Sequence, residues 1–199
     1  MARKFIICMA LSFVTAMNLF QFAKAETETN SVLTVKELIV KHAYEMDLDP
    51  ALALSIAKTE SNFCHNKKSK YGAIGVFQLM PSTAKKMGYN PYLLQENIKG
   101  GISYYKEMYE MFGSMELALA AYNAGPGNVK KYKGIPPFWE TKHFVSSIIS
   151  DYKNLKRNPD PAIADYDNKI KEINNKIAEE NFRMQHEAII QAYLSNQGV

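Results

Sequence analysis

The segment from Pro50 to Glu60 constrains the fold more than any other part of the chain. Its apolar residues point to almost every side of a helix, and they are Leu52, Ala53, Leu54, Ile56 and Ala57. Asp49 is suited to cap this helix, and Pro50 fits its first position. A helix that is apolar all round must be enclosed by other elements. The segment therefore predicts a central helix inside a domain of several helices.

Further helices are expected on both sides of this segment. One starts at Thr34, whose side chain would cap it in a capping box with Glu37. The others are expected at residues 81–87, 97–112, 115–123 and 141–155, with a short turn of helix after Gly127. Residues 64–79 lack helical periodicity, and their glycines indicate turns or a small hairpin. The predicted fold class is mainly α with minimal β, in a domain over residues 34–155.

The N-terminal residues 1–25 have the features of a signal peptide. Arg3 and Lys4 precede an apolar run, and Ala23 and Ala25 are small residues at the positions expected before a cleavage site. Cleavage before Glu26 would give an exported protein, in the periplasm of a Gram-negative envelope or otherwise secreted. The alternative is an uncleaved anchor, although the apolar run is at the low end for a membrane span. Residues 26–33 are expected to be a flexible N-terminal segment.

The charge balance gives no sign of a strongly charged partner. The whole chain has 24 basic and 20 acidic residues, and removal of Arg3, Lys4 and Lys24 leaves 21 basic and 20 acidic, a net charge of +1. No nucleic-acid motif is found. Cys64 would be the one cysteine after cleavage, so no internal disulfide is expected, and the four histidines show no metal-ligand pattern.

A long helix is expected at residues 162–195, after a linker at residues 156–161. The segment contains neither Gly nor Pro, and its first half has an apolar seam with alternating steps of three and four residues: Ile163, Tyr166, Ile170, Ile173 and Ile177. Three possibilities remain open for this helix. It folds back on the domain, it binds a protein partner or forms a coiled coil, or it is a partly disordered tail.

Glu60 is the first candidate for a catalytic residue. A carboxylate at the apolar end of a helix is costly to ionise, so its pKa should rise and allow it to hold a proton near neutral pH. A general acid that cleaves glycosidic bonds needs this property. The alternative, taken on the residue alone, is a helix-end Glu that points into water.

Four separated motifs carry a resemblance to a known family. They are Glu60-Ser61-Asn62-Phe63, Gly72-Ala73-Ile74-Gly75-Val76-Phe77-Gln78-Leu79-Met80-Pro81, Ala118-Leu119-Ala120-Ala121-Tyr122-Asn123-Ala124-Gly125-Pro126-Gly127 and Gly134-Ile135-Pro136-Pro137-Phe138-Trp139-Glu140-Thr141. Residues 35–155 resemble the soluble lytic transglycosylases, which are lysozyme-like enzymes that cut bacterial peptidoglycan. The resemblance implies a lysozyme-like fold and does not extend to the C-terminal helix.

The resemblance implies that Glu60 is the sole catalytic acid. It would protonate the glycosidic oxygen between N-acetylmuramic acid and N-acetylglucosamine, and then take a proton from the muramoyl 6-hydroxyl as a 1,6-anhydro ring closes. This reaction needs no water, no second carboxylate, no metal and no organic cofactor. The sequence leaves open whether Asp47, Asp49 or Glu140 approaches Glu60 in space.

The resemblance also implies roles for other residues. Tyr122 would orient the catalytic carboxyl through a neutral hydrogen bond. Sugar contacts are implied for Ser69, Gln78 and Met80, and Glu140 would bind substrate or brace its lobe. Structural roles are expected for Ser61, Gly72, Gly75, Asn123 and Gly125.

The chain departs from the family pattern at a few positions. Trp139 stands where a Pro is common, and it could stack on a sugar or simply pack.

Two other functions remain open. One is a hydrolysing muramidase, which would need a positioned water and a second carboxylate. The other is a non-catalytic glycan-binding module that recruits an envelope-spanning machine through its C-terminal helix.

Overall fold

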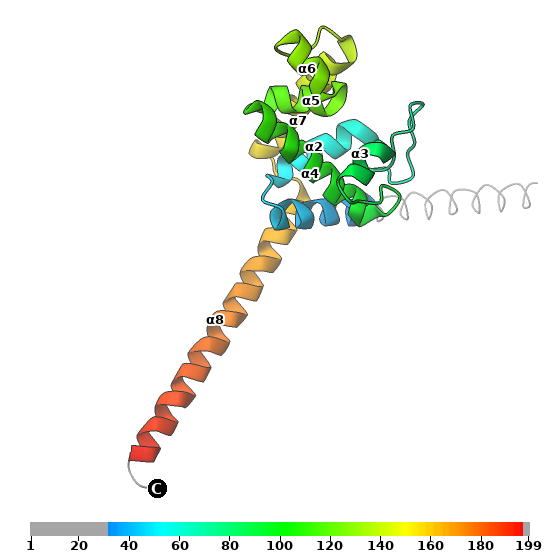
Figure 1. Ribbon diagram of the computed structural model, residues 1–199. Helices are drawn as coiled ribbons and strands as arrows, with labels where there is room; N and C mark the ends of the chain where they lie inside the picture. Colours follow the sequence, from blue (N-terminus) through cyan, green and yellow to red (C-terminus); the bar gives the residue numbers. More distant parts are fainter. Residues whose placement is uncertain (1–31, 197–199) are drawn as a thin grey trace, which may run out of the picture.

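The structure is a computed structural model that describes residues 32–196. The expected signal peptide and residues 26–31 lie outside the described residues. A first helix covers residues 32–45, and seven further helices follow (Figure 1): α2 (Pro50–Ser61), α3 (Pro81–Lys86), α4 (Leu94–Phe112), α5 (Met115–Ala124), α6 (Pro126–Tyr132), α7 (Trp139–Arg157) and α8 (Pro161–Asn196).

Helix α2 lies at the centre of the domain, as the sequence predicts. Every residue from Pro50 to Ala57 is buried. The Asp49 carboxylate accepts a hydrogen bond from the backbone N–H of Ala51 at 2.9 Å, which confirms the expected cap. Helix α2 packs on α7, which in turn packs on α5, while α5 also contacts α4 and α6. The core is thus formed by helices on several sides of one apolar helix.

The segment between α2 and α3 has almost no regular structure. It forms isolated antiparallel bridges between Lys68 and Ile74 and between Ile74 and Leu79. The buried Asn97 side chain of α4 holds it: its Nδ2 donates to the carbonyl of Ile74 at 2.8 Å, and its Oδ1 accepts from the N–H of Phe77 at 2.9 Å. The expectation of minimal β structure is therefore confirmed.

Several expected boundaries were wrong. The first helix already includes residues 32 and 33, so Thr34 lies inside it rather than at its cap. Helix α7 begins at Trp139 and continues to Arg157, and α8 begins at Pro161. Only residues 158–160 lie between these two helices, which is shorter than the expected linker over 156–161.

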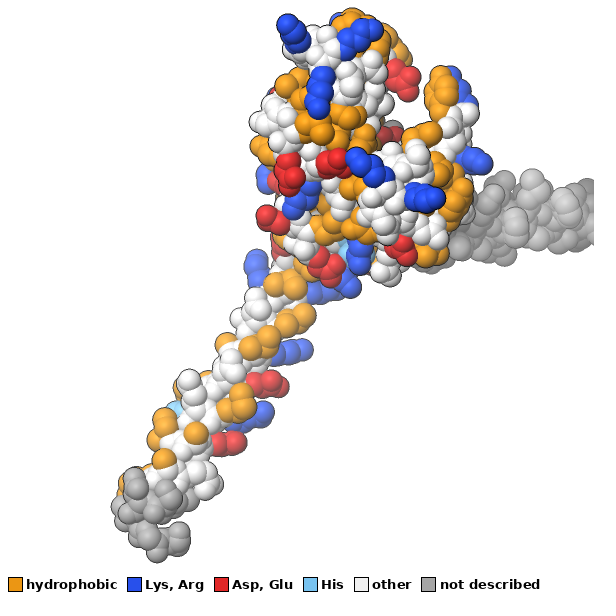
Figure 2. Space-filling view, in the orientation of Figure 1, with side chains coloured by type: hydrophobic (Ala, Val, Ile, Leu, Met, Phe, Trp, Pro, Cys, Tyr) orange, Lys and Arg blue, Asp and Glu red, His pale blue; other side chains and the backbone are white. Residues whose placement is uncertain are grey.

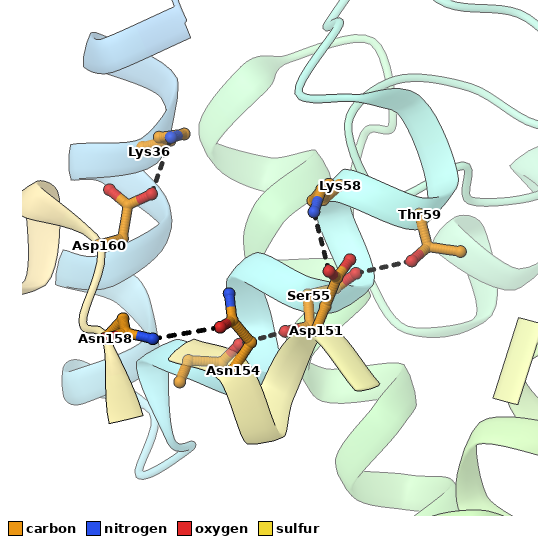
Figure 3. Close-up of polar contacts among 9 residues, drawn as sticks. Lys36, Ser55, Lys58, Thr59, Asp151, Asn154, Asn158 and Asp160 are labelled. Carbon is orange, nitrogen blue, oxygen red and sulfur yellow. Dashed lines mark hydrogen bonds and ion pairs between the residues drawn. The ribbon is translucent and has the colours of Figure 1, made fainter. Parts of the chain in front are cut away.

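Polar contacts join the last turns of α7 to the rest of the domain (Figure 3). Lys58 of α2 donates to the Asp151 carboxylate of α7 at 2.8 Å, and Lys36 of the first helix donates to Asp160 at 2.7 Å. The second oxygen of Asp160 accepts from the N–H of Ala162 at 3.1 Å, so this residue also caps α8. The start of α8 is therefore fixed to the domain.

Beyond its first turns, α8 projects away from the domain (Figure 1). Ala162 is buried, the ring of Tyr166 stacks on that of Tyr44 with centroids 5.1 Å apart, and the Tyr44 hydroxyl donates to Asp167 at 2.6 Å. From Ile170 to Tyr193 the large apolar side chains are exposed. The helix thus docks on the domain through its first turns alone. Within residues 32–196, no helix is both long and apolar enough to cross a bilayer.

Candidate active site

A cleft of about 430 Å³ lies between the loop that precedes α3 and the lobe formed by α5, α6 and the start of α7. Figure 2 shows the hollow between this lobe and the projecting loop. The lining residues come from both sides and from the end of α2: Glu60, Ser69, Tyr71, Ala73, Gln78, Leu79, Met80, Thr83, Tyr104, Tyr122, Asn123, Ala124, Gly125 and Glu140. All the expected catalytic and sugar-contacting residues therefore lie in one cleft.

Glu60 lies at the C-terminal end of α2 and is partly exposed in the cleft. Burial raises the pKa of its carboxyl from 4.5 to about 8, while the ammonium of Lys67 lowers this pKa and the negative charge of Glu140 raises it. At neutral pH the carboxyl is therefore protonated in most molecules. It can donate a proton to an oxygen atom that enters the cleft.

Lys67 is a neighbour of Glu60 that no sequence pattern predicts. Its ammonium donates to the backbone carbonyl of Glu60 at 2.7 Å. This carbonyl lies in the last turn of α2, where backbone oxygens lack helical partners. Lys67 thus joins the loop to the helix end that carries the catalytic candidate, and its positive charge favours the ionised form of Glu60.

Tyr122 of α5 is buried behind the cleft, with its ring between those of Tyr104 at 5.1 Å and Phe144 at 6.3 Å. Its hydroxyl donates to the backbone carbonyl of Phe77 at 2.8 Å. The single O–H proton is therefore used by Phe77 and not by Glu60, in contrast to the expected hydrogen bond. Burial raises the pKa of Tyr122 well above its usual value, so the group is neutral, and its oxygen can still accept from a protonated carboxyl.

The loop side of the cleft presents polar atoms in fixed directions. The Gln78 amide nitrogen donates to the carbonyls of Gly75 at 2.8 Å and Lys67 at 3.1 Å. Both amide protons are thus used, and within the described residues no hydrogen bond to the Gln78 side-chain oxygen is found. The Ser69 hydroxyl oxygen accepts from the N–H of Ala73 at 3.0 Å, which leaves its proton to donate elsewhere. One acceptor and one donor therefore lie on the same wall, beside the 41 % exposed side chain of Met80.

The residues expected to be structural lie behind this wall or at the opposite lobe. The Ser61 hydroxyl donates to the backbone carbonyl of Val76 at 2.8 Å and so connects α2 to the loop. At Gly75, φ is 78°, and an added Cβ would lie 2.5 Å from the Asn97 side chain, so only glycine fits there. Gly72 also has a positive φ, of 87°.

The opposite lobe is held by a contact between α5 and α7. The Asn123 side-chain oxygen accepts from the Thr141 hydroxyl at 2.8 Å. Gly125, with φ of 83°, ends α5 and starts α6. Glu140 lies in the first turn of α7, exposed to the cleft. These contacts place Glu140 on the side of the cleft that faces the loop.

Among the described carboxylates, Glu140 is the one that shares the cleft with Glu60. Asp47 and Asp49 instead line a separate cavity of about 480 Å³ beside the start of α8. Burial alone would raise the pKa of Asp49, but hydrogen bonds from Lys156, Ala51 and Tyr152 bring that pKa below its ordinary value. Asp49 is therefore a charged structural group and not a second acid at the cleft.

Other cleft residues were not assigned a role from the sequence. Tyr104 of α4 lies in a segment that resembles the family, and its ring contacts Tyr122. Tyr71 and Thr83 line the cleft, but neither belongs to a periodic pattern or to a residue pair that predicts a site. Their positions depend on how the loop folds on α4, which local sequence does not encode.

The chain matches the family model described as the transglycosylase SLT domain over residues 37–145. It is 32 % identical over 143 residues to the soluble lytic murein transglycosylase of Salmonella typhimurium, a match that covers 59 % of this chain and 22 % of the relative. It is 31 % identical over 130 residues to a transglycosylase of the enterobacteria phage PRD1, covering 64 % of this chain and 46 % of that protein.

Two solved structures are similar to the domain. An inactive mutant of the lytic transglycosylase Slt from Pseudomonas aeruginosa superposes with a TM-score of 0.54 at 31 % identity, covering 62 % of this chain and 24 % of that one. The 70-kDa soluble lytic transglycosylase of Escherichia coli gives 0.55 at 29 % identity, covering 63 % and 25 %. The chain spans less than half of the length of the relatives it matches. The match over most of the helical domain shows that the chain belongs to the transglycosylase SLT family, with its lysozyme-like fold.

Proposed function

We propose that this protein is a lytic transglycosylase that cleaves the β-1,4 bond between N-acetylmuramic acid and N-acetylglucosamine in peptidoglycan and forms a 1,6-anhydro product. The observation that carries the proposal is Glu60, a carboxyl with a pKa of about 8 in a cleft lined with sugar-compatible donors and acceptors. The names of the relatives, lytic murein transglycosylases, support the same substrate class.

The reaction uses Glu60 twice. The protonated carboxyl first donates its proton to the glycosidic oxygen, and the bond between this oxygen and the anomeric carbon breaks. The resulting carboxylate then takes the proton of the muramoyl 6-hydroxyl as that oxygen bonds to the anomeric carbon. The proton gained equals the proton given, so the enzyme returns to its starting state without consuming water.

The surroundings of Glu60 suit both steps. Burial favours the protonated form before bond cleavage, and the nearby Lys67 ammonium stabilises the carboxylate that forms afterwards. The Tyr122 oxygen offers an acceptor for the protonated carboxyl. In this proposal Gln78 and Ser69 contact N-acetyl and hydroxyl groups of the sugars, and Met80 provides an apolar wall.

A hydrolysing muramidase is the second candidate, because Glu140 also lines the cleft. An inverting hydrolase needs a carboxylate that activates water on the face of the sugar opposite the acid. Glu140 is exposed in the first turn of α7, where a carboxylate is accessible to water, so the reaction products decide between the two candidates. In the proposed reaction it binds substrate or braces the lobe.

Product analysis tests the proposal. Purified peptidoglycan sacculi would be digested with the protein and the fragments analysed by mass spectrometry. We expect anhydro-muropeptides with the parent and a loss of product of at least about 10²-fold with Glu60→Gln. Glu179→Gln, which removes an exposed carboxylate on α8, is the matched control and should retain activity. Reducing-end products would establish the hydrolase instead.

Export to the periplasm is part of the proposal, since the substrate lies outside the cytoplasmic membrane. It rests on the N-terminal pattern of residues 1–25, which lie outside the described structure. Intact-mass analysis of protein from the periplasmic fraction should give the mass of a chain that starts at Glu26. A mass that includes residues 1–25 would contradict cleavage.

A protein partner that binds residues 162–195 stays a prediction. The exposed apolar side chains after Ile170 are consistent with it, because this part of α8 projects away from the domain. Affinity purification with the wild-type chain and with a variant that carries Ile173→Lys and Ile177→Lys would test it. Recovery of the same envelope proteins by both chains would contradict the prediction.

A further inference from the structure

Trp139 is the most exposed large apolar residue of the described chain, with 78 % of its surface accessible. From its sequence context, this residue could either pack in the protein or stack on a sugar. The exposed fraction excludes packing in the core. An indole ring left in water is unfavourable, and a flat aromatic face is a common means of binding a sugar ring.

The Trp139 ring is held in one orientation by its own helix. It stacks on His143, one turn further along α7, with ring centroids 5.2 Å apart and an angle of 6° between the planes. The loop before it is also held by an edge contact between Phe138 and Tyr132 at 5.6 Å. The imidazole therefore covers part of one indole face in an offset stack, and the rest of the ring stays exposed to a flat ligand.

Trp139 is the first residue of α7 and directly precedes a residue that lines the cleft. The next residue, Glu140, lines the cleft, and Phe144 on the same face as Glu140 stacks on Tyr122 behind the cleft. Trp139 and His143 occupy the neighbouring face, about 100° further round the helix. A glycan strand that left the cleft past Glu140 on this side of α7 would pass the exposed indole.

We propose that Trp139, supported by His143, forms an additional binding site for a pyranose ring of the glycan strand, outside the cleft that contains Glu60. The inference rests on the proposed function, because it assumes an amino-sugar strand as the ligand. The apolar face of the sugar would stack on the indole, and its N–H and hydroxyl groups would remain hydrated. Strands long enough to reach beyond Glu140 would then bind more tightly than short ones.

The chain contains a single tryptophan, so its fluorescence reports on this site alone. The Glu60→Gln protein, which cannot turn substrate over, would be titrated with soluble strands of alternating N-acetylglucosamine and N-acetylmuramic acid of several lengths. We expect a saturable shift in tryptophan emission with the long strands. Calorimetry on the same samples gives the dissociation constant independently of the fluorophore.

The variants separate this site from the rest of the cleft. In the Glu60→Gln background, Trp139→Ala should weaken binding of long strands about 3- to 10-fold by calorimetry, whereas Trp139→Phe, which retains a flat ring, should weaken it less. With Glu60 present, Trp139→Ala should raise KM and leave kcat nearly unchanged. Tyr92→Ala, which removes another exposed aromatic ring that does not line the cleft, is the matched control and should have no effect.

The outcomes distinguish this inference from the proposed function. If long strands bind by calorimetry but leave the emission unchanged, or if Trp139→Ala binds as well as Tyr92→Ala, the sugar site at Trp139 is overturned and the proposed function stands. If the Glu60→Gln protein binds no strand at all, both proposals fail.

Discussion

At the scale of single residues, the behaviour of Glu60 follows from where an apolar helix ends. The sequence predicts a carboxyl that is costly to ionise, and the structure gives it a pKa of about 8. The sequence did not predict that Lys67 contacts the backbone of Glu60, because this contact depends on the path of the following loop. The catalytic candidate could therefore be found locally, but the groups that adjust its acidity could not.

The pH dependence of activity should report this carboxyl. Since the proton donor is the protonated form, activity should fall as the pH rises through about 8. Lys67→Met should move this alkaline limb to higher pH, because the nearby positive charge lowers the pKa. Glu140→Gln should move the limb to lower pH, because the nearby negative charge raises the pKa.

Initial rates on sacculi between pH 5 and pH 10 would measure these shifts. Lys68→Met removes an exposed lysine from the same loop and is the control. If activity fell at the same alkaline pH in all three variants, the group that controls this fall would not be Glu60.

Stability should depend on the same group. The folded-state pKa of Glu60 lies above its ordinary value of 4.5. The contribution of Glu60 to the free energy of unfolding is therefore fully present below about pH 4.5 and is lost as the pH rises to about 8. The loss is expected to be on the order of a few kcal/mol at most, because the side chain is partly exposed. In Glu60→Gln this part of the pH dependence should vanish.

Urea unfolding at several pH values measures the free energy of unfolding of each variant, with Glu179→Gln as the control. The same pH dependence in both variants would show that Glu60 is solvated.

At the scale of elements, the helices could be predicted from periodicity and caps, whereas the loop before α3 could not. Asp49 marks the start of α2 by local chemistry, and the structure confirms it. The shape of the loop instead depends on Asn97, more than 20 residues away from the Ile74 carbonyl that it binds. The helix expected at residues 141–155 begins two residues earlier, at Trp139. Contacts between distant segments thus decide what local patterns leave open.

The contact between α4 and this loop should be sensitive to added volume. At Gly101 of α4, a Cβ would lie 2.3 Å from the buried ring of Phe77. Gly101→Ala should therefore destabilise the domain by about 1–3 kcal/mol and reduce activity, because the loop carries Gln78. Gly127→Ala in α6 is the matched control, since nothing lies within 4 Å of the added atom there. Thermal unfolding of the two variants measures the difference, and equal melting temperatures would contradict the packing argument.

At the scale of the whole molecule, the sequence predicted a long C-terminal helix but left its placement open. The structure shows that neither complete folding back nor complete separation describes it. Ala162, Tyr166 and Asp167 contact the domain, whereas Ile173 and Ile177 are about half exposed. The apolar seam predicted at the start of α8 is therefore divided between two environments. Periodicity could identify the seam but not how far along it the domain extends.

Truncation should separate the two parts of α8. Removal of residues 170–199 should leave the melting temperature of the domain nearly unchanged, because the side chains lost have few contacts with it. Removal of residues 160–199 should lower it, since the ion pair of Asp160 with Lys36 and the stacking of Tyr166 on Tyr44 are lost. Differential scanning calorimetry of both chains would measure this. A large loss of stability in the shorter truncation would contradict the observed docking.

The projecting part of α8 also sets a geometric scale. From Ile170 to Asn196 a straight helix extends about 40 Å, comparable to the width of a small domain. If the far end were immobilised on a fixed structure, the catalytic domain would sweep an arc of that radius around the anchor. In the proposed reaction, cleavage would then be confined to a patch of cell wall whose radius is set by this length, and each whole turn removed from the helix would shorten that radius by about 5 Å.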